Sequence, residues 1–195
     1  GAYQATDYLT RLGHTRIGFI TLPYMKTASI RSRLEGYQSA LEHNDIPFDE
    51  HLVLNVVEYG EYLDSSNEAA RSERIRAFLE EARPTAVFCI TDDIALDVLK
   101  VAHMEGIRIP AEVSVVGFDD VEYAKLVNPP LTTVAQRRER LGRQAMKLVN
   151  DRIKGNLTKP KRVVIPTYLV TRGSTAPLGG TSESRDTSSA ALSLR

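Results

Sequence analysis

Val115-Val116-Gly117-Phe118-Asp119-Asp120 is an apolar run that ends abruptly in two acidic residues. A second run of the same form lies upstream, where the apolar residues 86–90 are followed by Thr91-Asp92-Asp93. Ligands of open α/β sheets bind beyond the carboxyl ends of the strands, so an aspartate placed there can face a bound molecule. Aspartate after a strand also caps helices and forms turns, and this structural interpretation applies to each of these residues as well.

Segments of helical and strand character alternate along the chain around these two runs. Apolar residues at helical spacing predict helices within residues 5–12, 29–41, 75–82, 95–102 and 141–153. Short apolar runs predict strands at residues 17–20, 52–57, 86–90 and 114–118, with shorter β segments at 131–134, 163–166 and 168–170. Alternation with short connections and uniformly apolar strands predicts an α/β fold, in which a parallel sheet is flanked by helices.

The composition is that of an ordinary soluble globular protein of 195 residues, with 42% hydrophobic and 26% charged residues. A chain of this length can bury a sizeable core and form one domain or somewhat more. Lysine plus arginine and aspartate plus glutamate each total 25, so the formal net charge is zero. This balance gives no general attraction to DNA phosphates or anionic lipids, which argues against DNA binding by the chain itself.

Cysteine content and hydropathy exclude several kinds of site and location. Cys89 is the only cysteine, so neither an intrachain disulfide nor a cysteine-based metal site can form. No stretch approaches the roughly 20 apolar residues that span a bilayer, and the N-terminus has no signal-peptide pattern. We therefore expect a cytoplasmic protein with no membrane contact and no cofactor. The chain starts at Gly1 within the first turn of a predicted helix, so we expect it to be part of a longer protein.

Polar and aromatic residues near the strand ends predict a site for a polyol or a sugar. The candidates are the strand-end acids, Thr91, the segment 29–37 with Arg31 and Arg33, and the aromatic pair Tyr59 and Tyr62. Carboxylates and arginine hydrogen-bond neighbouring hydroxyls with defined directions, and an aromatic ring covers an apolar sugar face. A small polyhydroxylated molecule is therefore the predicted ligand.

Six short motifs, taken together and in their order along the chain, resemble those of the effector-binding domain of LacI/GalR-family transcriptional repressors. They are Leu12-Gly13-His14-Thr15-Arg16-Ile17, Arg31-Ser32-Arg33-Leu34-Glu35-Gly36-Tyr37, Thr91-Asp92-Asp93-Ile94-Ala95-Leu96, Val113-Ser114-Val115-Val116-Gly117-Phe118-Asp119-Asp120, Pro130-Leu131-Thr132-Thr133-Val134 and Leu169-Val170-Thr171-Arg172-Gly173-Ser174-Thr175. The resemblance extends from Gly1 to about Thr175.

The resemblance implies a division of the chain between two lobes. Members of the family have an N-terminal helix-turn-helix head, a hinge, and a two-lobed core of the type I periplasmic-binding-protein-like fold. By this resemblance, residues 1–128 form the C-terminal lobe and residues 161–175 return to it. Residues 129–160 form a linker, at the stiff Asn128-Pro129-Pro130, and a segment that belongs to the N-terminal lobe. The polar tail, residues 176–195, is expected to be disordered.

The resemblance also assigns roles to the candidate site residues. Asp119, Arg33 and Thr91 are expected to hydrogen-bond the effector, and Tyr62 is expected to provide an aromatic platform. Asp92 matches a family aspartate that suits a role in holding the loop and the N-terminus of the following helix. It is kept as a further candidate contact to the effector.

The implied protein is a regulatory module that binds a small sugar-like effector between two lobes and thereby changes the DNA affinity of a remote head. Operator DNA is then contacted only through that head, which the motifs do not include. In the family, the region that contains Tyr123, Leu126 and Val127 helps to pair C-terminal lobes, so a homodimer is expected. Asp120 is expected to be a turn or cap residue beside Asp119.

Two other functions use the same features. The four strand-end aspartates could hold Mg²⁺ for phosphoryl transfer in an enzyme. Against this, no Gly-rich phosphate loop is present, and the four histidines have no metal-ligand spacing. A periplasmic-type sugar-binding transport receptor shares the implied fold, but the sequence has no secretory segment.

The last predicted helix has an unusual environment in this chain. Its apolar stripe consists of Leu141, Ala145, Leu148 and Ile153, and in the intact family core it would pack on a sheet that this chain does not contain. The helix is therefore expected to be exposed, displaced or covered by a partner. For the same reason Asp119 lines half of a cleft, and weak or no effector binding is expected of the chain alone.

Overall fold

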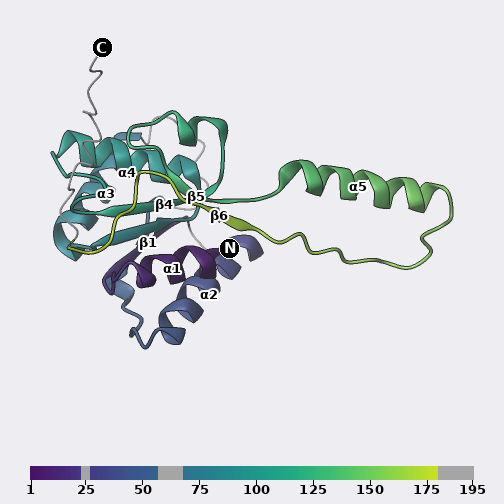
Figure 1. The fold of residues 1–195 in the computed structure, drawn as a ribbon, viewed down its shortest axis with the longest axis horizontal. Coiled ribbons are helices and arrows are strands. Elements are labelled where there is room, and N and C mark those ends of the chain that lie inside the picture. The colour runs from purple at the N-terminus through teal and green to yellow at the C-terminus, as the bar shows by residue number, and fades with distance from the viewer. Residues whose placement is uncertain (23–26, 57–67, 180–195) are drawn as a thin grey trace, which may run out of the picture.

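The computed structural model of the chain describes residues 1–22, 27–56 and 68–179 and is built around one six-stranded sheet (Figure 1). The strands are β1 (Ile17–Thr21), β2 (Val53–Asn55), β3 (Ala86–Cys89), β4 (Ser114–Asp119), β5 (Thr132–Ala135) and β6 (Tyr168–Val170). The helices are α1 (Ala2–Arg11), α2 (Ala28–His43), α3 (Glu68–Ala82), α4 (Asp92–Met104) and α5 (Arg138–Ile153), with short 3-10 helices η2 (Glu50–Leu52) and η4 (Glu122–Lys125).

The sheet is mostly parallel and is covered on both faces. Its strand order is β2-β1-β3-β4-β5-β6, and only the pairing of β5 with β6 is antiparallel. Helices α1 and α2 lie against one face and α3 and α4 against the other (Figure 1). Every residue of β1 and β3 is buried, which is why their sequences are apolar without alternation. The predicted α/β fold is confirmed, except that the last strand runs antiparallel.

The strand order creates a ligand-binding position at one edge of the sheet. The chain passes from β1 to β2 on one side and then crosses to β3 on the other, so the connections after β1 and β3 diverge. Ligands of open α/β sheets bind at such a switch point, beyond the carboxyl ends of the strands. Thr91 follows β3 and Asp119 ends β4, which places both residues at this edge.

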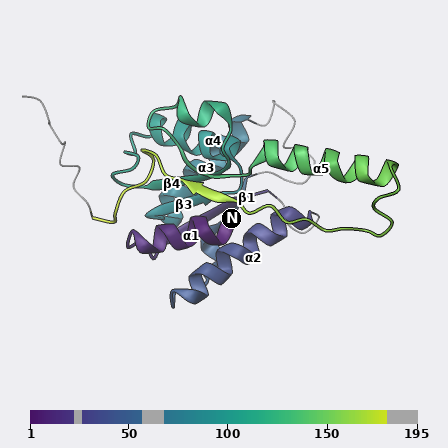
Figure 2. The ribbon, with the colours of Figure 1, turned by 45° about the vertical axis from the view of Figure 1, so that its right-hand side comes forward.

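The arm formed by residues 136–167, with α5 at its centre, extends away from the rest of the molecule (Figures 1 and 2). Helix α5, which is described in full, has no buried residue, and Ile153 is 79% exposed. This confirms the expectation that the apolar stripe of the last helix lacks a partner here. Residues 163–166 form no strand, so the strand predicted there is wrong. The backbone of that segment has no neighbouring strand to supply hydrogen bonds.

The segment that follows β6 returns along α1. The Tyr8 hydroxyl bonds the Thr175 hydroxyl at 2.9 Å, and the backbone N–H of Leu178 donates to the carbonyl of Leu12 at 2.8 Å. The predicted disordered tail began at residue 176, and residues 180–195 of it lie outside the described residues. None of the described helices is long and apolar enough to span a membrane.

His14 holds the same returning segment by a hydrogen bond, and its burial makes the stability of the fold depend on pH. The ring is buried, its Nε2–H donates to the Ala176 carbonyl at 3.0 Å, and Nδ1 lies 3.1 Å from the Thr85 hydroxyl. Burial lowers the pKa of His14 below its usual value of 6.5, and the bond to Ala176 only partly opposes this. A lowered pKa in the folded state means that its stabilising contribution is present above pH 6.5 and is lost as the pH falls below it.

We therefore expect the free energy of unfolding of the native chain to fall more steeply between pH 7 and pH 5 than that of His14→Gln. Glutamine keeps a donor for the carbonyl of Ala176 but does not titrate. Urea denaturation at each pH measures the difference, and His51→Gln, at an exposed histidine, is the control. Equal slopes for the native chain and His14→Gln would contradict the assignment.

Candidate functional site

Asp119 presents its carboxylate at the end of β4, partly exposed beside two polar groups. Gln136 donates a hydrogen bond from Nε2 to Asp119 Oδ1, and Arg33 Nη2 lies 3.9 Å from the same oxygen. The Asp119 side chain is 26% exposed and that of Arg33 18% exposed. Burial raises the pKa of Asp119, whereas the charge of Arg33 and the bond from Gln136 oppose the increase. The carboxylate is therefore sheltered but not sealed from solvent.

Arg33 is held in place from the second turn of α2. Its guanidinium carbon lies 3.9 Å from the centre of the Phe118 ring, and Nη1 donates to the carbonyl of Ile90 at the end of β3. Burial lowers the pKa of Arg33, and Asp119 opposes this effect. An arginine side chain loses much conformational freedom when it is fixed, so this stacking prepares a rigid donor before any ligand arrives.

The spacing of Asp119 and Arg33 suits a bridging hydroxyl group. A separation of 3.9 Å is longer than a normal N–H···O hydrogen bond of about 2.7–3.2 Å. The two groups attract each other, yet each keeps hydrogen-bonding capacity for a third partner. A sugar hydroxyl can donate to a carboxylate and accept from a guanidinium at the same time.

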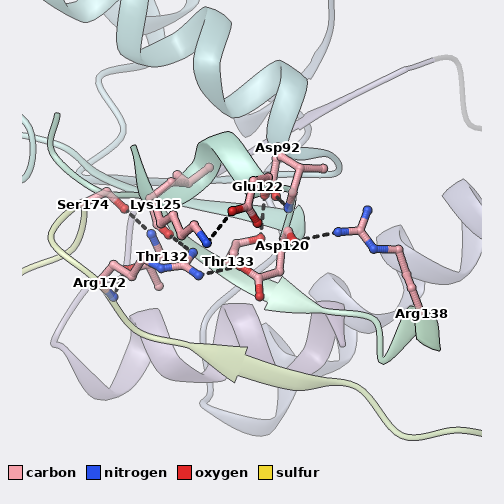
Figure 3. Close-up of polar contacts among 11 residues, drawn as sticks. Asp92, Asp120, Glu122, Lys125, Thr132, Thr133, Arg138, Arg172 and Ser174 are labelled. Carbon is pink, nitrogen blue, oxygen red and sulfur yellow. Dashed lines mark hydrogen bonds and ion pairs between the residues drawn. The ribbon is translucent and has the colours of Figure 1, made fainter. Parts of the chain in front are cut away.

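The two aspartates form a turn with an unusual backbone. Asp119 has φ of 121° and Asp120 has φ of 54°, both in the region that favours glycine. Strain of this kind costs roughly 1–3 kcal/mol for each residue and persists only where surrounding contacts hold it. Asp120 makes such a contact, because its carboxylate pairs with Arg172 at 2.5 Å (Figure 3). The interpretation of Asp120 as a turn residue is confirmed.

Asp92 is built into the protein interior. It is 1% exposed, and its two oxygens accept hydrogen bonds from the Thr133 hydroxyl at 2.5 Å and the Val121 N–H at 2.9 Å (Figure 3). Burial raises the pKa of Asp92 and these two bonds oppose the increase. A Cβ at Gly117 would collide with this carboxylate, so glycine is required there. Asp92 thus holds the loop after β4, which matches one of the two roles expected for it.

Thr91 occupies the N-cap of α4, a role that the sequence suggested for the aspartate that follows it. Its Oγ1 accepts a hydrogen bond from the Ile94 N–H at 3.3 Å. The hydroxyl keeps its own proton and lies at the same sheet edge as Asp119, just beyond the neighbouring strand β3. The hydroxyl can therefore accept the capping hydrogen bond and at the same time donate one to a ligand.

Sequence reasoning missed two residues of the site and named two that cannot be placed. Gln136 and Phe118 were missed, although Gln136 directly follows the apolar strand β5 and carries the same strand-end signal as Asp119. Phe118 was quoted only as part of an apolar run, and its ring proves to support Arg33. Tyr59 and Tyr62 lie outside the described residues.

Within the described residues, neither a metal centre nor the groove between α3 and α4 adds to the strand-end site. In the described part of the chain, no group of three histidine, cysteine, aspartate or glutamate side chains could hold a metal ion. A groove of about 530 Å³ between α3 and α4, lined by Glu68, Lys100 and Met104 among others, shares no residue with the strand-end site. Its charged walls are paired with one another, as in the ion pair of Lys100 with Glu68.

Comparisons with known proteins agree with this geometry. Residues 6–175 match the family described as periplasmic binding protein-like domain. The HTH-type transcriptional regulator CelR of Thermobifida fusca is 39% identical over 89% of this chain and 49% of its own length. The ribose operon repressor of Haemophilus influenzae is 32% identical over 89% of this chain and 50% of its own length. The chain thus spans about half the length of the curated relatives it matches.

Solved structures give the same result. A CelR–cellobiose complex matches 89% of this chain and 51% of its own, with a TM-score of 0.77 and 38% identity. A LacI-family regulator from Enterococcus faecium with bound ribose matches 91% of this chain and 63% of its own, with a TM-score of 0.79 and 29% identity. Both matched structures contain a bound sugar.

Proposed function

Because the chain belongs to the periplasmic-binding-protein-like domain family, in the form found in LacI-family transcriptional regulators, we propose that it is the C-terminal lobe of a sugar-sensing repressor. The observation that carries the proposal is the pair of Asp119 and Arg33, fixed at 3.9 Å at the switch point of the sheet. The bound cellobiose and ribose of the matched structures support a sugar as the ligand class.

The proposed mechanism assigns one task to each residue. Asp119 accepts from sugar hydroxyls, Arg33 donates to them, and Thr91 adds a donor from the neighbouring strand. Tyr62 provides the aromatic platform, and Asp92 contributes by fixing the loop that carries Asp119 rather than by touching the sugar. The opposing lobe closes over the sugar, and the DNA-binding head responds to the closure.

Closure is the step that turns sugar binding into regulation. Coupling between two sites in such proteins is worth about 1–3 kcal/mol, or roughly 5–150-fold in DNA affinity. The full-length protein that we propose is a cytoplasmic homodimer, and it contacts operator DNA through its head. The relatives are transcriptional regulators, and this favours regulation over the phosphoryl-transfer and transport alternatives.

A ligand screen of the full-length protein tests the proposal. A sugar that binds the folded state raises the thermal midpoint, and the rise grows with the logarithm of the sugar concentration once that exceeds Kd. Ribose, cellobiose, further pentoses and hexoses, polyols and their phosphates form the panel, and inorganic phosphate is the non-sugar control. A concentration-dependent rise with at least one sugar supports the function, whereas no rise with any of them refutes it.

Dimerisation of the C-terminal lobe is tested by one substitution on the loop after β4. Leu126 is 75% exposed and lies beside the half-exposed Tyr123 in a loop that the resemblance places at the dimer contact. Burying a leucine side chain contributes about 1.5–3 kcal/mol, and a charge there opposes association. Light scattering of Leu126→Glu should therefore report a monomer. If Ile153→Glu in the arm dissociates the chain and Leu126→Glu does not, the contact lies on the arm instead.

A further inference from the structure

The turn at Asp119 and Asp120 touches both chain segments that connect the lobe to the arm. The outgoing segment, residues 136–138, follows β5, and the returning segment, residues 168–172, contains β6. Asp119 accepts a hydrogen bond from Gln136 on the outgoing segment. Asp120 contacts both segments, as Figure 3 shows for its two arginine partners.

The contacts of Asp120 use its backbone and its side chain separately. Arg138, the first residue of α5, donates from Nη2 to the Asp120 carbonyl at 2.8 Å. Arg172 donates from the other side to the Asp120 carboxylate at 2.5 Å. One residue of the turn thus joins the start of the outgoing helix to the end of the returning strand.

Arg172 is itself anchored to the sheet. Its Nη1 donates to the carbonyl of Leu131 at 2.7 Å, and its backbone N–H donates to the Thr132 hydroxyl at 2.9 Å. Its side chain is 16% exposed, so water competes weakly with these bonds. A guanidinium held by two acceptors in different directions fixes the orientation of the carboxylate it pairs with.

The positive charge of Arg172 also offsets the negative charge of the neighbouring aspartates. Asp92, Asp119 and Asp120 cluster at one edge of the sheet, and Asp120 disfavours the ionised form of Asp92 while Arg172 favours it. The charge of Arg33 likewise favours the ionised form of Asp119. Without Arg172, Asp120 would repel Asp92, and the strained backbone of the turn would lose the contact that opposes its relaxation.

We infer that Asp120 and Arg172 are positioning residues: their ion pair, with the bond from Arg138, holds Asp119 toward the ligand and fixes the turn relative to both segments of the arm. Neither side chain is assigned a contact with the sugar. The inference deepens the proposed function and rests on it for the role of Asp119. A sugar that engages Asp119 competes with Gln136 for the carboxylate, and the change reaches the arm through the same turn.

Hydrogen exchange of the 195-residue chain tests the positioning role of the Asp120–Arg172 pair without any ligand. Asp120→Asn keeps a residue that tolerates positive φ but removes the charge, and Arg172→Gln removes the partner. Each substitution should accelerate amide exchange in the first hydrogen-bonded turn of α5, which begins at Leu141, and in residues 168–172 by about tenfold, the effect of losing one charge-assisted hydrogen bond. The double variant should exchange no faster than the more affected single variant, because both substitutions break one interaction.

Matched controls separate positioning from general destabilisation. Arg108→Gln breaks an exposed pair with Glu112 and should leave exchange at the arm unchanged. Exchange in β3 should stay constant in all variants, since a merely structural loss would accelerate it there as well. Unchanged exchange in both segments, additive effects in the double variant, or equal acceleration in β3 would each overturn the inference.

Sugar affinity completes the test in the full-length protein. If the native protein binds ribose or cellobiose, Arg172→Gln should weaken that binding about tenfold although Arg172 makes no contact with the sugar. Native affinity in Arg172→Gln would overturn the positioning role. If the native protein binds no sugar, the proposed function fails. The exchange measurement then tests by itself whether the Asp120–Arg172 pair fixes the turn relative to the arm.

Discussion

Replacing Asp119 by alanine is expected to weaken sugar binding by the full-length protein by about 10- to 150-fold, the equivalent of one charge-assisted hydrogen bond. The carboxylate is the acceptor of the site, and its removal also leaves the fixed guanidinium of Arg33 without its counter-charge. Titration calorimetry with the sugar that gives the largest thermal shift measures the change. Asp119→Asn, which retains an oxygen acceptor, should fall between alanine and the native residue.

A neighbouring acid provides the control for that measurement. Glu122 lies three residues further along, is exposed, and pairs with Lys125 away from Arg33. Glu122→Ala should bind sugar with native affinity, because surface pairs of this kind contribute little. Native affinity in Asp119→Ala, with a native thermal midpoint, would show that the site residues are assigned wrongly.

The largest expected effect on stability comes from Asp92→Ala. Removal of this buried carboxylate leaves the Thr133 hydroxyl and the Val121 N–H unpaired, at a cost of about 1–3 kcal/mol each. We therefore expect the free energy of unfolding, measured by urea denaturation, to fall by about 2–5 kcal/mol. Asp93→Ala, one position further along α4 and exposed, should change it by less than about 1 kcal/mol.

A second substitution makes this prediction specific to Asp92. Alanine at Gly117 collides with the Asp92 carboxylate, so Gly117→Ala alone should be destabilising. In the Asp92→Ala background the main obstacle is gone, and the same change should cost less. Equal costs of Gly117→Ala in both backgrounds would contradict the packing described for this carboxylate.

Local patterns explain why the fold could be predicted from the sequence. Apolar runs such as residues 86–90 and 114–118 favour buried strands, and the helices between them follow from the periodicity of their apolar residues. The segment 163–166 has the same local character but forms no strand. Strand formation depends on a neighbouring strand, which is a property of the assembled sheet and not of the segment.

The candidate site could be predicted only in part. The strand-end rule identified Asp119, and the resemblance identified Arg33, whose position above Phe118 depends on packing between α2 and β4. The roles of Thr91 and Asp92 were harder to separate, since either residue type can cap a helix. The structure separates them through Thr133, which lies 41 residues beyond Asp92 in the sequence. Its hydroxyl donates to the Asp92 carboxylate, and the N-cap bond is accepted by Thr91.

The exposed helix α5 has a mechanical consequence for a protein that signals over distance. A helix of 16 residues is about 24 Å long, and its first residue is bonded to the Asp120 carbonyl. A rotation of about 10° at that turn would move the far end of the helix by about 4 Å. In the proposed repressor α5 packs on the second lobe, so a rotation at this turn would carry that lobe with it.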